Sequence, residues 1–134
     1  MAVVVFDADV LIGYLNSDDV HHAAAVRRVT NALVPGTGRL ISAVNYTEIL
    51  IGPLRAAGQA GAGVVDAMLA RFGIETVDVG AALARDAAAL RADESLELPD
   101  AYAVATALQE RRRGEDVRLE SFDERVCKTF ARLA

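Results

Sequence analysis

The sequence contains one cysteine, one lysine and no long apolar stretch. Cys127 alone cannot form an internal disulfide bond, which fits a reducing, cytoplasmic setting. A membrane-spanning helix needs about 18 or more consecutive apolar residues, and every apolar run here is interrupted well before that length. No basic segment precedes the first apolar run, so we expect neither secretion nor insertion into a membrane.

The chain also lacks the positive charge of a protein that coats nucleic acid. Its net charge is −5, from 19 acidic and 14 basic residues, and 13 of the basic residues are arginine. This balance does not exclude a nuclease, because an acidic metal site lowers the total charge while a separate basic patch holds phosphates. The abundance of arginine and alanine is typical of a GC-rich genome.

The length of 134 residues predicts one domain spanning residues 1–134. With 53% hydrophobic and 25% charged residues, the composition excludes disorder as the main state. A chain of this size buries about two-thirds of its unfolded surface, so its core needs no disulfide or structural metal.

Short apolar runs alternate with segments of helical periodicity, which predicts an α/β fold. We expect strands over 3–6, 39–42, 74–79 and 117–120, and helices over 9–15, 21–33, 43–57, 64–72, 81–92, 100–113 and 123–133. Residues 58–63 are predicted to be a connection of small residues and 93–97 an acidic loop, and Pro53 is expected to kink or end its helix. Because every connection is long enough for a crossover, the pattern predicts a parallel sheet covered by helices on both faces.

Four carboxylates occupy positions that a solvated surface explains poorly, namely Asp7, Glu48, Asp100 and Asp123. Asp7 and Asp123 follow strands whose carboxyl ends should share one edge of the sheet, where open α/β sheets bind ligands. Other roles remain open: Asp100 would suit the positive end of a helix dipole, and Asp123 would cap the last helix. Asp9 either supports the site or caps the first helix.

If the fold brings these carboxylates together, either some are protonated or a cation lies among them. Oxygen ligands in an open site favour Mg²⁺ or Mn²⁺ over zinc. Such an ion activates water and stabilises charge on a phosphate, so the expected substrate is a phosphodiester or a phosphate ester.

Four segments together resemble the PIN-domain family, and more narrowly its VapC-type toxins. They are residues 5–12 (VFDADVLI), the helix that contains Glu48, residues 98–108 (LPDAYAVATAL) and residues 121–123 (SFD). The resemblance implies a three-layer α/β/α sandwich around a parallel sheet of four to five strands. It also implies an endoribonuclease that uses Mg²⁺ or Mn²⁺ to cut tRNA or ribosomal RNA, with Asp7, Glu48, Asp100 and Asp123 as the catalytic, metal-binding residues. Ser121 is then expected to hydrogen-bond a carboxylate or a metal-bound water.

The same resemblance implies partners for the chain. VapC-type toxins form homodimers and are held inactive by a small antitoxin encoded beside them. A housekeeping RNA-processing nuclease of the same family is the alternative, and the neighbouring genes would distinguish the two.

Some basic residues are candidates for contacts with RNA phosphates. Arg111 and Arg112 end a predicted helix, where cations also suit the helix dipole, and Arg39 begins a predicted strand. His21 and His22 are adjacent, so on a helix they point about 100° apart and cannot share a zinc ion.

The same acidic residues are also compatible with two other functions. A haloacid dehalogenase-type phosphatase uses an Asp-x-Asp motif after its first strand, which Asp7 and Asp9 match, but it needs a lysine before its final acidic pair. The only lysine here, Lys128, follows Asp123. A non-catalytic binding module is the second alternative, and it would tolerate the loss of Asp7.

Overall fold

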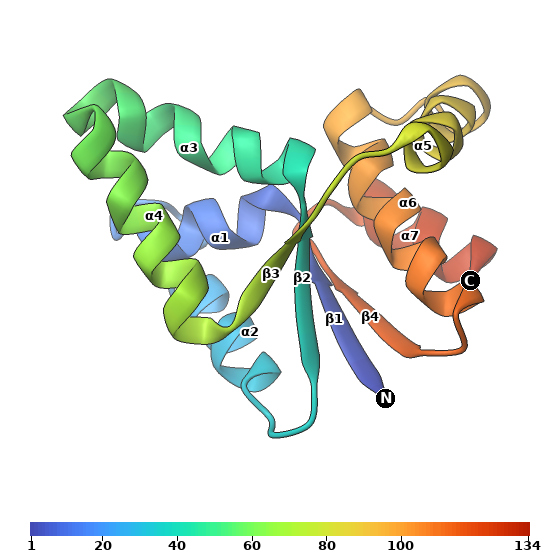
Figure 1. Cartoon of the computed structure of the whole chain (residues 1–134), viewed down its shortest axis with the longest axis horizontal. Helices are drawn as coiled ribbons and strands as arrows, with labels where there is room; N and C mark the ends of the chain where they lie inside the picture. Colours follow the sequence, from blue (N-terminus) through green and yellow to red (C-terminus); the bar gives the residue numbers. More distant parts are fainter.

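The computed structural model describes residues 1–134 as four strands and seven helices (Figure 1). In chain order they are β1 (Ala2–Phe6), α1 (Ala8–Leu15), α2 (His22–Ala32), β2 (Gly38–Ser42), α3 (Ala43–Ala57), α4 (Gln59–Phe72), β3 (Ile74–Val77), α5 (Ala81–Glu94), α6 (Leu98–Arg112), β4 (Asp116–Glu120) and α7 (Glu124–Leu133). No helix is long and apolar enough to cross a membrane.

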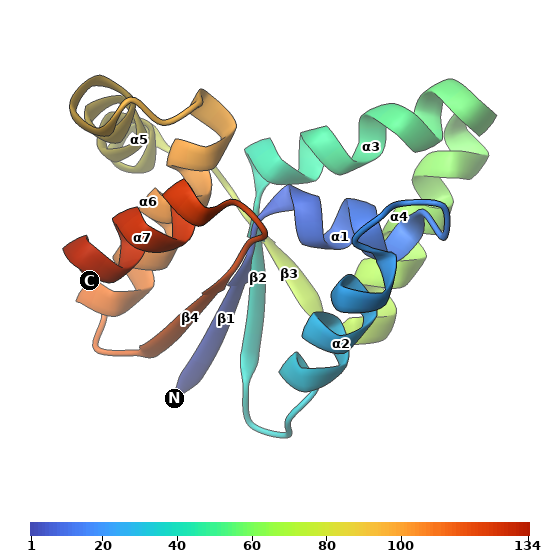
Figure 2. The same ribbon diagram turned by 180° about the vertical axis from the view of Figure 1, so that it is seen from behind.

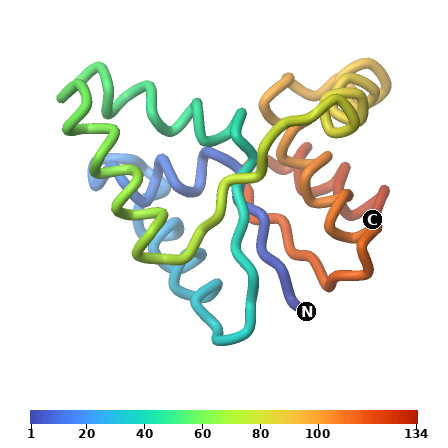
Figure 3. The backbone as a smooth tube through the Cα atoms, viewed as in Figure 1, coloured from blue at the N-terminus to red at the C-terminus, as the bar shows by residue number.

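All four strands are parallel, in the order β3-β2-β1-β4. The chain adds β2 and β3 on one side of β1, then returns to place β4 on the other side, as the backbone trace shows (Figure 3). The topology therefore reverses between β1 and β4, and crevices for ligands form at such a switch point, outside the carboxyl ends of the strands.

Helices cover both faces of the sheet, so the molecule is a three-layer α/β/α sandwich. Helices α1–α4 lie on one side and α5–α7 on the other (Figures 1 and 2). Alternate residues of β1 supply the two cores: Val4 and Phe6 pack toward the first group of helices, and Val3 and Val5 toward the second. These four side chains are at most 4% exposed, which confirms the strand buried on both faces that the sequence predicts.

The predicted connection over 58–63 is wrong, because α4 already begins at Gln59. Only Gly58, with φ of 59°, separates α3 from α4. A Cβ on Gly61 would lie 2.0 Å from the carbonyl oxygen of Pro53, so the two helices pack closer than any larger residue allows. Gly61 in this segment therefore reflects close helix packing.

Other boundaries differ from the predictions by a few residues. Pro53 does not end α3, which continues to Ala57. Strand β3 ends at Val77, and α5 extends through the predicted acidic loop as far as Glu94. Helix α6 begins at Leu98 and places Pro99 in its first turn, where a missing N–H costs nothing.

Candidate active site

Five carboxylates face one region beside the switch point, and we call them the acidic cluster: Asp7, Asp9, Glu48, Asp100 and Asp123. They come from the carboxyl end of β1, from α1, α3 and the first turn of α6, and from the N-cap of α7. The fold thus brings together the four predicted catalytic residues and the predicted supporting residue Asp9.

Asp7 is the most deeply buried member, at 3% exposure. It caps α1, because its Oδ1 accepts a hydrogen bond from the backbone N–H of Ala8 at 2.8 Å. Its Oδ2 accepts a hydrogen bond from the Ser121 hydroxyl, also at 2.8 Å. Ser121 thus contacts a carboxylate, one of the two partners expected for it, and both oxygens of Asp7 are fixed in orientation.

Asp9 does not cap α1, since Asp7 takes that role. Instead, Asp9 Oδ2 accepts a hydrogen bond from the backbone N–H of Phe122 at 3.0 Å and so ties α1 to the loop after β4. Asp123 caps α7 through bonds from the N–H groups of Arg125 and Val126, and its own N–H donates to Ser121 Oγ at 3.0 Å. The capping role considered for Asp123 is therefore real and coexists with its place in the acidic cluster.

Glu48 is positioned by two buried polar residues that the sequence analysis did not select, Ser42 and Asn45. The Asn45 amide group donates to Glu48 Oε1 and to the carbonyl oxygen of Pro99, each at 3.0 Å. Ser42 donates to Asn45 Oδ1 at 2.6 Å and caps α3. The sequence does contain a sign of this arrangement: Ser42, Asn45 and Glu48 are three residues apart. That spacing places polar side chains on one face of a helix that is otherwise largely apolar.

Burial and mutual repulsion raise the pKa values of Asp7, Asp9, Glu48 and Asp100. Desolvation raises the pKa of Asp7 from 3.8 to about 7, with a further contribution from the charge of Asp9 and opposition from the Ser121 hydrogen bond. Desolvation raises the pKa of Asp100 to about 6, and the charges of Asp123 and Glu48 add to this shift. The pKa values of Asp9 and Glu48 are also raised, chiefly by burial. Carboxyl groups with such pKa values are typical of functional sites.

The acidic cluster has the chemistry of a divalent-cation site. Asp9 Oδ1 is buried and has no hydrogen-bond partner, so it is an oxygen acceptor that the protein itself leaves unsatisfied. The surrounding donors are all carboxylate oxygens, which suit Mg²⁺ or Mn²⁺. In this structure no three acidic, histidine or cysteine side chains lie close enough together to hold a metal ion.

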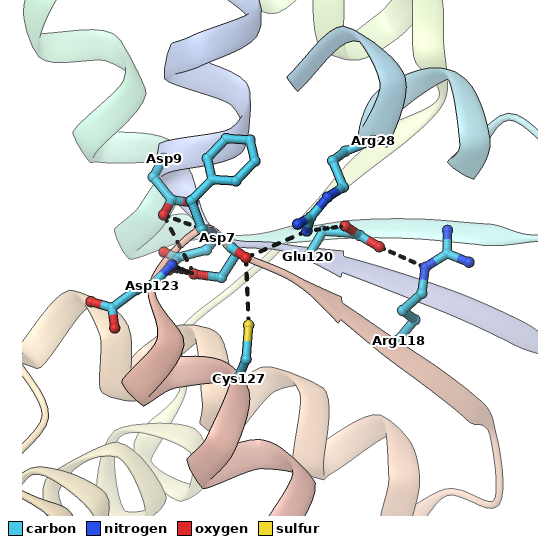
Figure 4. Close-up of polar contacts among 9 residues, drawn as sticks. Asp7, Asp9, Arg28, Arg118, Glu120, Asp123 and Cys127 are labelled. Atoms are coloured by element: carbon cyan, nitrogen blue, oxygen red, sulfur yellow. Dashed lines mark hydrogen bonds and ion pairs between the residues drawn. The ribbon is translucent and has the colours of Figure 1, made fainter. Parts of the chain in front are cut away.

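A second charged network lies next to the acidic cluster and was also missed (Figure 4). Glu120 is only 6% exposed, and it pairs with Arg28 and with Arg118 at 2.7 Å each. Arg28 Nη1 also lies 3.4 Å from the carbonyl oxygen of Ser121. Glu120 ends β4 and its partner Arg28 is 92 residues away, so no local pattern could reveal the pair.

The predicted RNA-contacting residues do not join the acidic cluster. Arg39 donates to the carbonyl oxygens of Phe72, Ala32 and Thr37, and the first two end α4 and α2. It therefore satisfies free carbonyls at helix ends, at the amino end of β2. Arg111 and Arg112 lie at the far end of α6, roughly 16 Å along its axis from Asp100.

Arg112 pairs with Asp86 at 3.0 Å. His21 and His22 have separate surroundings: His21 stacks on Phe122 at 4.7 Å between ring centroids, and His22 Nδ1 lies 2.8 Å from the Gly13 carbonyl oxygen.

One family model, that of the PIN domain, matches residues 4–133 of the chain. The chain belongs to the PIN-domain family. This membership gives no support to the haloacid dehalogenase-type alternative, which already lacked its lysine. A search of curated proteins finds no match.

Three solved structures share this PIN-domain fold. VapC20 of Mycobacterium tuberculosis, described as a toxin that cleaves the sarcin-ricin loop, superposes with a TM-score of 0.70 at 21% identity, over 94% of each chain. A toxin–antitoxin complex from Klebsiella pneumoniae gives 0.63 at 23% identity, over 90% of this chain and 86% of that one. VapBC2 of Rickettsia felis, bound to a DNA fragment from its promoter, gives 0.60 at 15% identity, over 90% and 99%.

Proposed function

We propose that the protein is a metal-dependent endoribonuclease, the toxin of a VapBC-type toxin–antitoxin pair. The acidic cluster carries this proposal, because five carboxylates gather at the switch point of a PIN domain and one of them keeps a buried, unpaired oxygen. The fold shared with VapC20 and with two toxin–antitoxin assemblies supports the toxin assignment.

In this mechanism Asp7, Glu48, Asp100 and Asp123 would hold Mg²⁺ or Mn²⁺, with support from the free oxygen of Asp9. An ion held there would supply the positive charge that activates water and neutralises the phosphate in an in-line displacement. Ser121 fixes the Asp7 carboxylate by its hydrogen bond, and Asn45 fixes Glu48. Asp100 accepts no hydrogen bond from the protein, so its oxygens are free for the ion or for orienting the attacking water.

We propose RNA as the substrate, with tRNA and ribosomal RNA as the expected targets. The test is cleavage of total cellular RNA by purified protein with Mg²⁺ or Mn²⁺ and with EDTA, compared with Asp100→Asn. We expect discrete fragments with metal only, and a loss of rate of at least about 100-fold in the variant. Asp93→Asn, the same change on the exposed face of α5, is the matched control and should cleave normally. Absence of cleavage by folded, antitoxin-free protein would contradict the proposal.

We further propose that the chain pairs with a VapB-type antitoxin and forms a homodimer. An apolar groove of ≈ 620 Å³ runs between α1 and α3 from Glu48, with Ile12 and Ile51 exposed along it. This groove fits an apolar antitoxin segment that ends at the acidic cluster. Co-expression with the adjacent short reading frame should yield a complex that Ile51→Glu weakens. If there is no such reading frame, a housekeeping RNA-processing role becomes the better explanation.

A further inference from the structure

A second, basic pocket of ≈ 320 Å³ adjoins the acidic cluster on the side of α2 and α7. Its walls come from His21 and Arg28 on one side, from Glu124, Cys127 and Lys128 of α7 on the other, and from Ser121 and Phe122 of the loop after β4. We call it the α2–α7 pocket.

Ser121 joins this pocket directly to the acidic cluster. Its hydroxyl donates to Asp7 Oδ2 at 2.8 Å, while its carbonyl oxygen lies 3.4 Å from Arg28 Nη1. The guanidinium group of Arg28 and the carboxylate of Asp7 therefore both contact Ser121 and lie on either side of it. One extended ligand could contact Arg28 and the acidic cluster at the same time.

Arg28 shares its acidic partner with a second arginine. Arg28 and Arg118 both pair with the single carboxylate of Glu120. Only Nη1 of Arg28 contacts protein acceptors, so Nε and Nη2 remain free to donate, and the side chain is 41% exposed. The guanidinium carbon lies 5.1 Å from the centroid of the Phe122 ring, which helps to hold the group in place.

Lys128 adds a second cation at the mouth of the pocket. It is 78% exposed, and its only acidic partner, Glu124, is 3.9 Å away and 86% exposed, so this pair is weak. His21 is held against the Phe122 ring and contributes a ring nitrogen. Two of the arginines considered for RNA contacts are engaged elsewhere, Arg39 with backbone carbonyls and Arg112 with Asp86.

We propose that the α2–α7 pocket binds a backbone phosphate of the RNA next to the scissile one, through Arg28, Lys128 and His21. The inference rests on the proposed function, because it assigns a subsite to the strand that the acidic cluster cleaves. An acidic cluster on a chain of net charge −5 repels a polyanion, so a fixed cation one residue away compensates that repulsion where the strand must pass. Phosphate contacts of this kind position the strand and do not read its sequence.

The test measures binding of a single-stranded RNA oligonucleotide by fluorescence anisotropy with Mg²⁺, in an Asp100→Asn background that does not cleave it. Lys128→Glu should weaken binding about tenfold in 0.1 M salt. It should also reduce the slope of the logarithm of the binding constant against the logarithm of salt concentration by about one. Arg85→Glu is the matched control: it makes the same change of charge on an exposed residue of α5, next to the Asp86 that pairs with Arg112, and it should leave binding nearly unchanged. His21→Ala, a second variant in the pocket, should weaken binding by a smaller factor.

Equal losses in Lys128→Glu and Arg85→Glu would overturn the proposal, because they would show an effect of overall charge. Unchanged binding in Lys128→Glu and His21→Ala would overturn it as well. Cleavage is measured separately with the Asp100 residue restored, where Lys128→Glu should raise KM more than it lowers kcat. If the unaltered protein does not cleave RNA at all, the proposed nuclease function is wrong. The binding assay then still tests whether the α2–α7 pocket binds RNA phosphate.

Discussion

Asp7 is a carboxyl group whose ionisation opposes folding in the absence of metal. Burial raises its pKa from 3.8 to about 7, so the folded protein holds the Asp7 proton more tightly than the unfolded chain does. The stability that comes from this proton is fully present below about pH 4 and is lost as the pH rises through about 7. The residue most enclosed in the site thus destabilises the metal-free protein at neutral pH.

We therefore expect Asp7→Asn to abolish cleavage and yet to stabilise the metal-free protein. In EDTA at pH 8 the free energy of unfolding should rise by about 1–3 kcal/mol, because the buried charge is removed. At pH 4 the gain should be much smaller, because Asp7 is then largely protonated in both the folded and the unfolded states. Urea titrations at the two pH values measure this difference. Asp93→Asn should change stability little at either pH, and a loss of stability in Asp7→Asn at pH 8 would contradict the prediction.

Asn45 acts on the site through Glu48, which it holds by a hydrogen bond from inside the protein. Asn45→Ala leaves Glu48 unfixed and the Pro99 carbonyl oxygen without its donor, so we expect about 1–3 kcal/mol of lost stability. Cleavage should fall by about tenfold or more even at temperatures where the variant is folded, because residues that orient metal ligands have effects of that size.

Titration of Mn²⁺ separates the two effects, since a purely structural role would leave the metal affinity of the folded variant unchanged. Thr47→Ala is the matched control, because its exposed hydroxyl bonds only to the Ala43 carbonyl of its own helix.

The sequence predicted the acidic residues better than the residues that hold them. Carboxylates stand out where strands end or where a helix is otherwise apolar, so Asp7, Glu48 and Asp100 could be selected by position alone. Glu120 could not, because its burial depends on Arg28, which is brought to it only by the crossover from β1 to β2. The contacts of Arg39 could not be predicted for the same reason: the helix ends that it contacts meet only in the folded structure.

At the scale of elements, α3 and α4 show how composition can mislead. Their glycines suggest a loop, whereas the structure uses Gly61 for the close approach to Pro53 and leaves Gly63 exposed, with nothing within 4 Å of where its Cβ would lie. Element types and order were otherwise predictable, because helical and strand periodicities differ clearly.

The two glycines provide a matched pair of substitutions in one helix. Gly61→Ala should destabilise the protein by about 3 kcal/mol, because its new methyl group collides with the backbone of α3. Gly63→Ala should be neutral or stabilise by about 0.5–1 kcal/mol through helix propensity. Urea denaturation of both variants checks the prediction, and similar behaviour of the two would show that α3 and α4 pack less closely than described.

At the scale of the whole molecule, the acidic cluster links α1, α3, α6 and α7, which come from both helical layers. A cation bound among them therefore stabilises the packing of both layers on the sheet. The α/β/α architecture itself was predictable, because parallel strands joined by helices leave few arrangements.

We expect Mn²⁺ at about 100 times its Kd to raise Tm by roughly 5–10 °C, since only the folded chain assembles the site. The increase should be larger at pH 8 than at pH 5.5, because protons compete for carboxyl groups with raised pKa values. Differential scanning fluorimetry with and without EDTA measures it. Asp100→Asn should lose most of the increase and Asp93→Asn none, whereas an equal increase in both would place the ion elsewhere.

The strand order also sets when the site can form during synthesis. Strand β1 is made first, but its neighbour β4 and the loop that carries Ser121 and Asp123 are made last. A nascent chain that ends before β4 has neither the hydroxyl that orients Asp7 nor the last carboxylate of the cluster. The complete acidic cluster can therefore assemble only after β4 and the loop that follows it have left the ribosome, whereas most of both helical layers is made earlier.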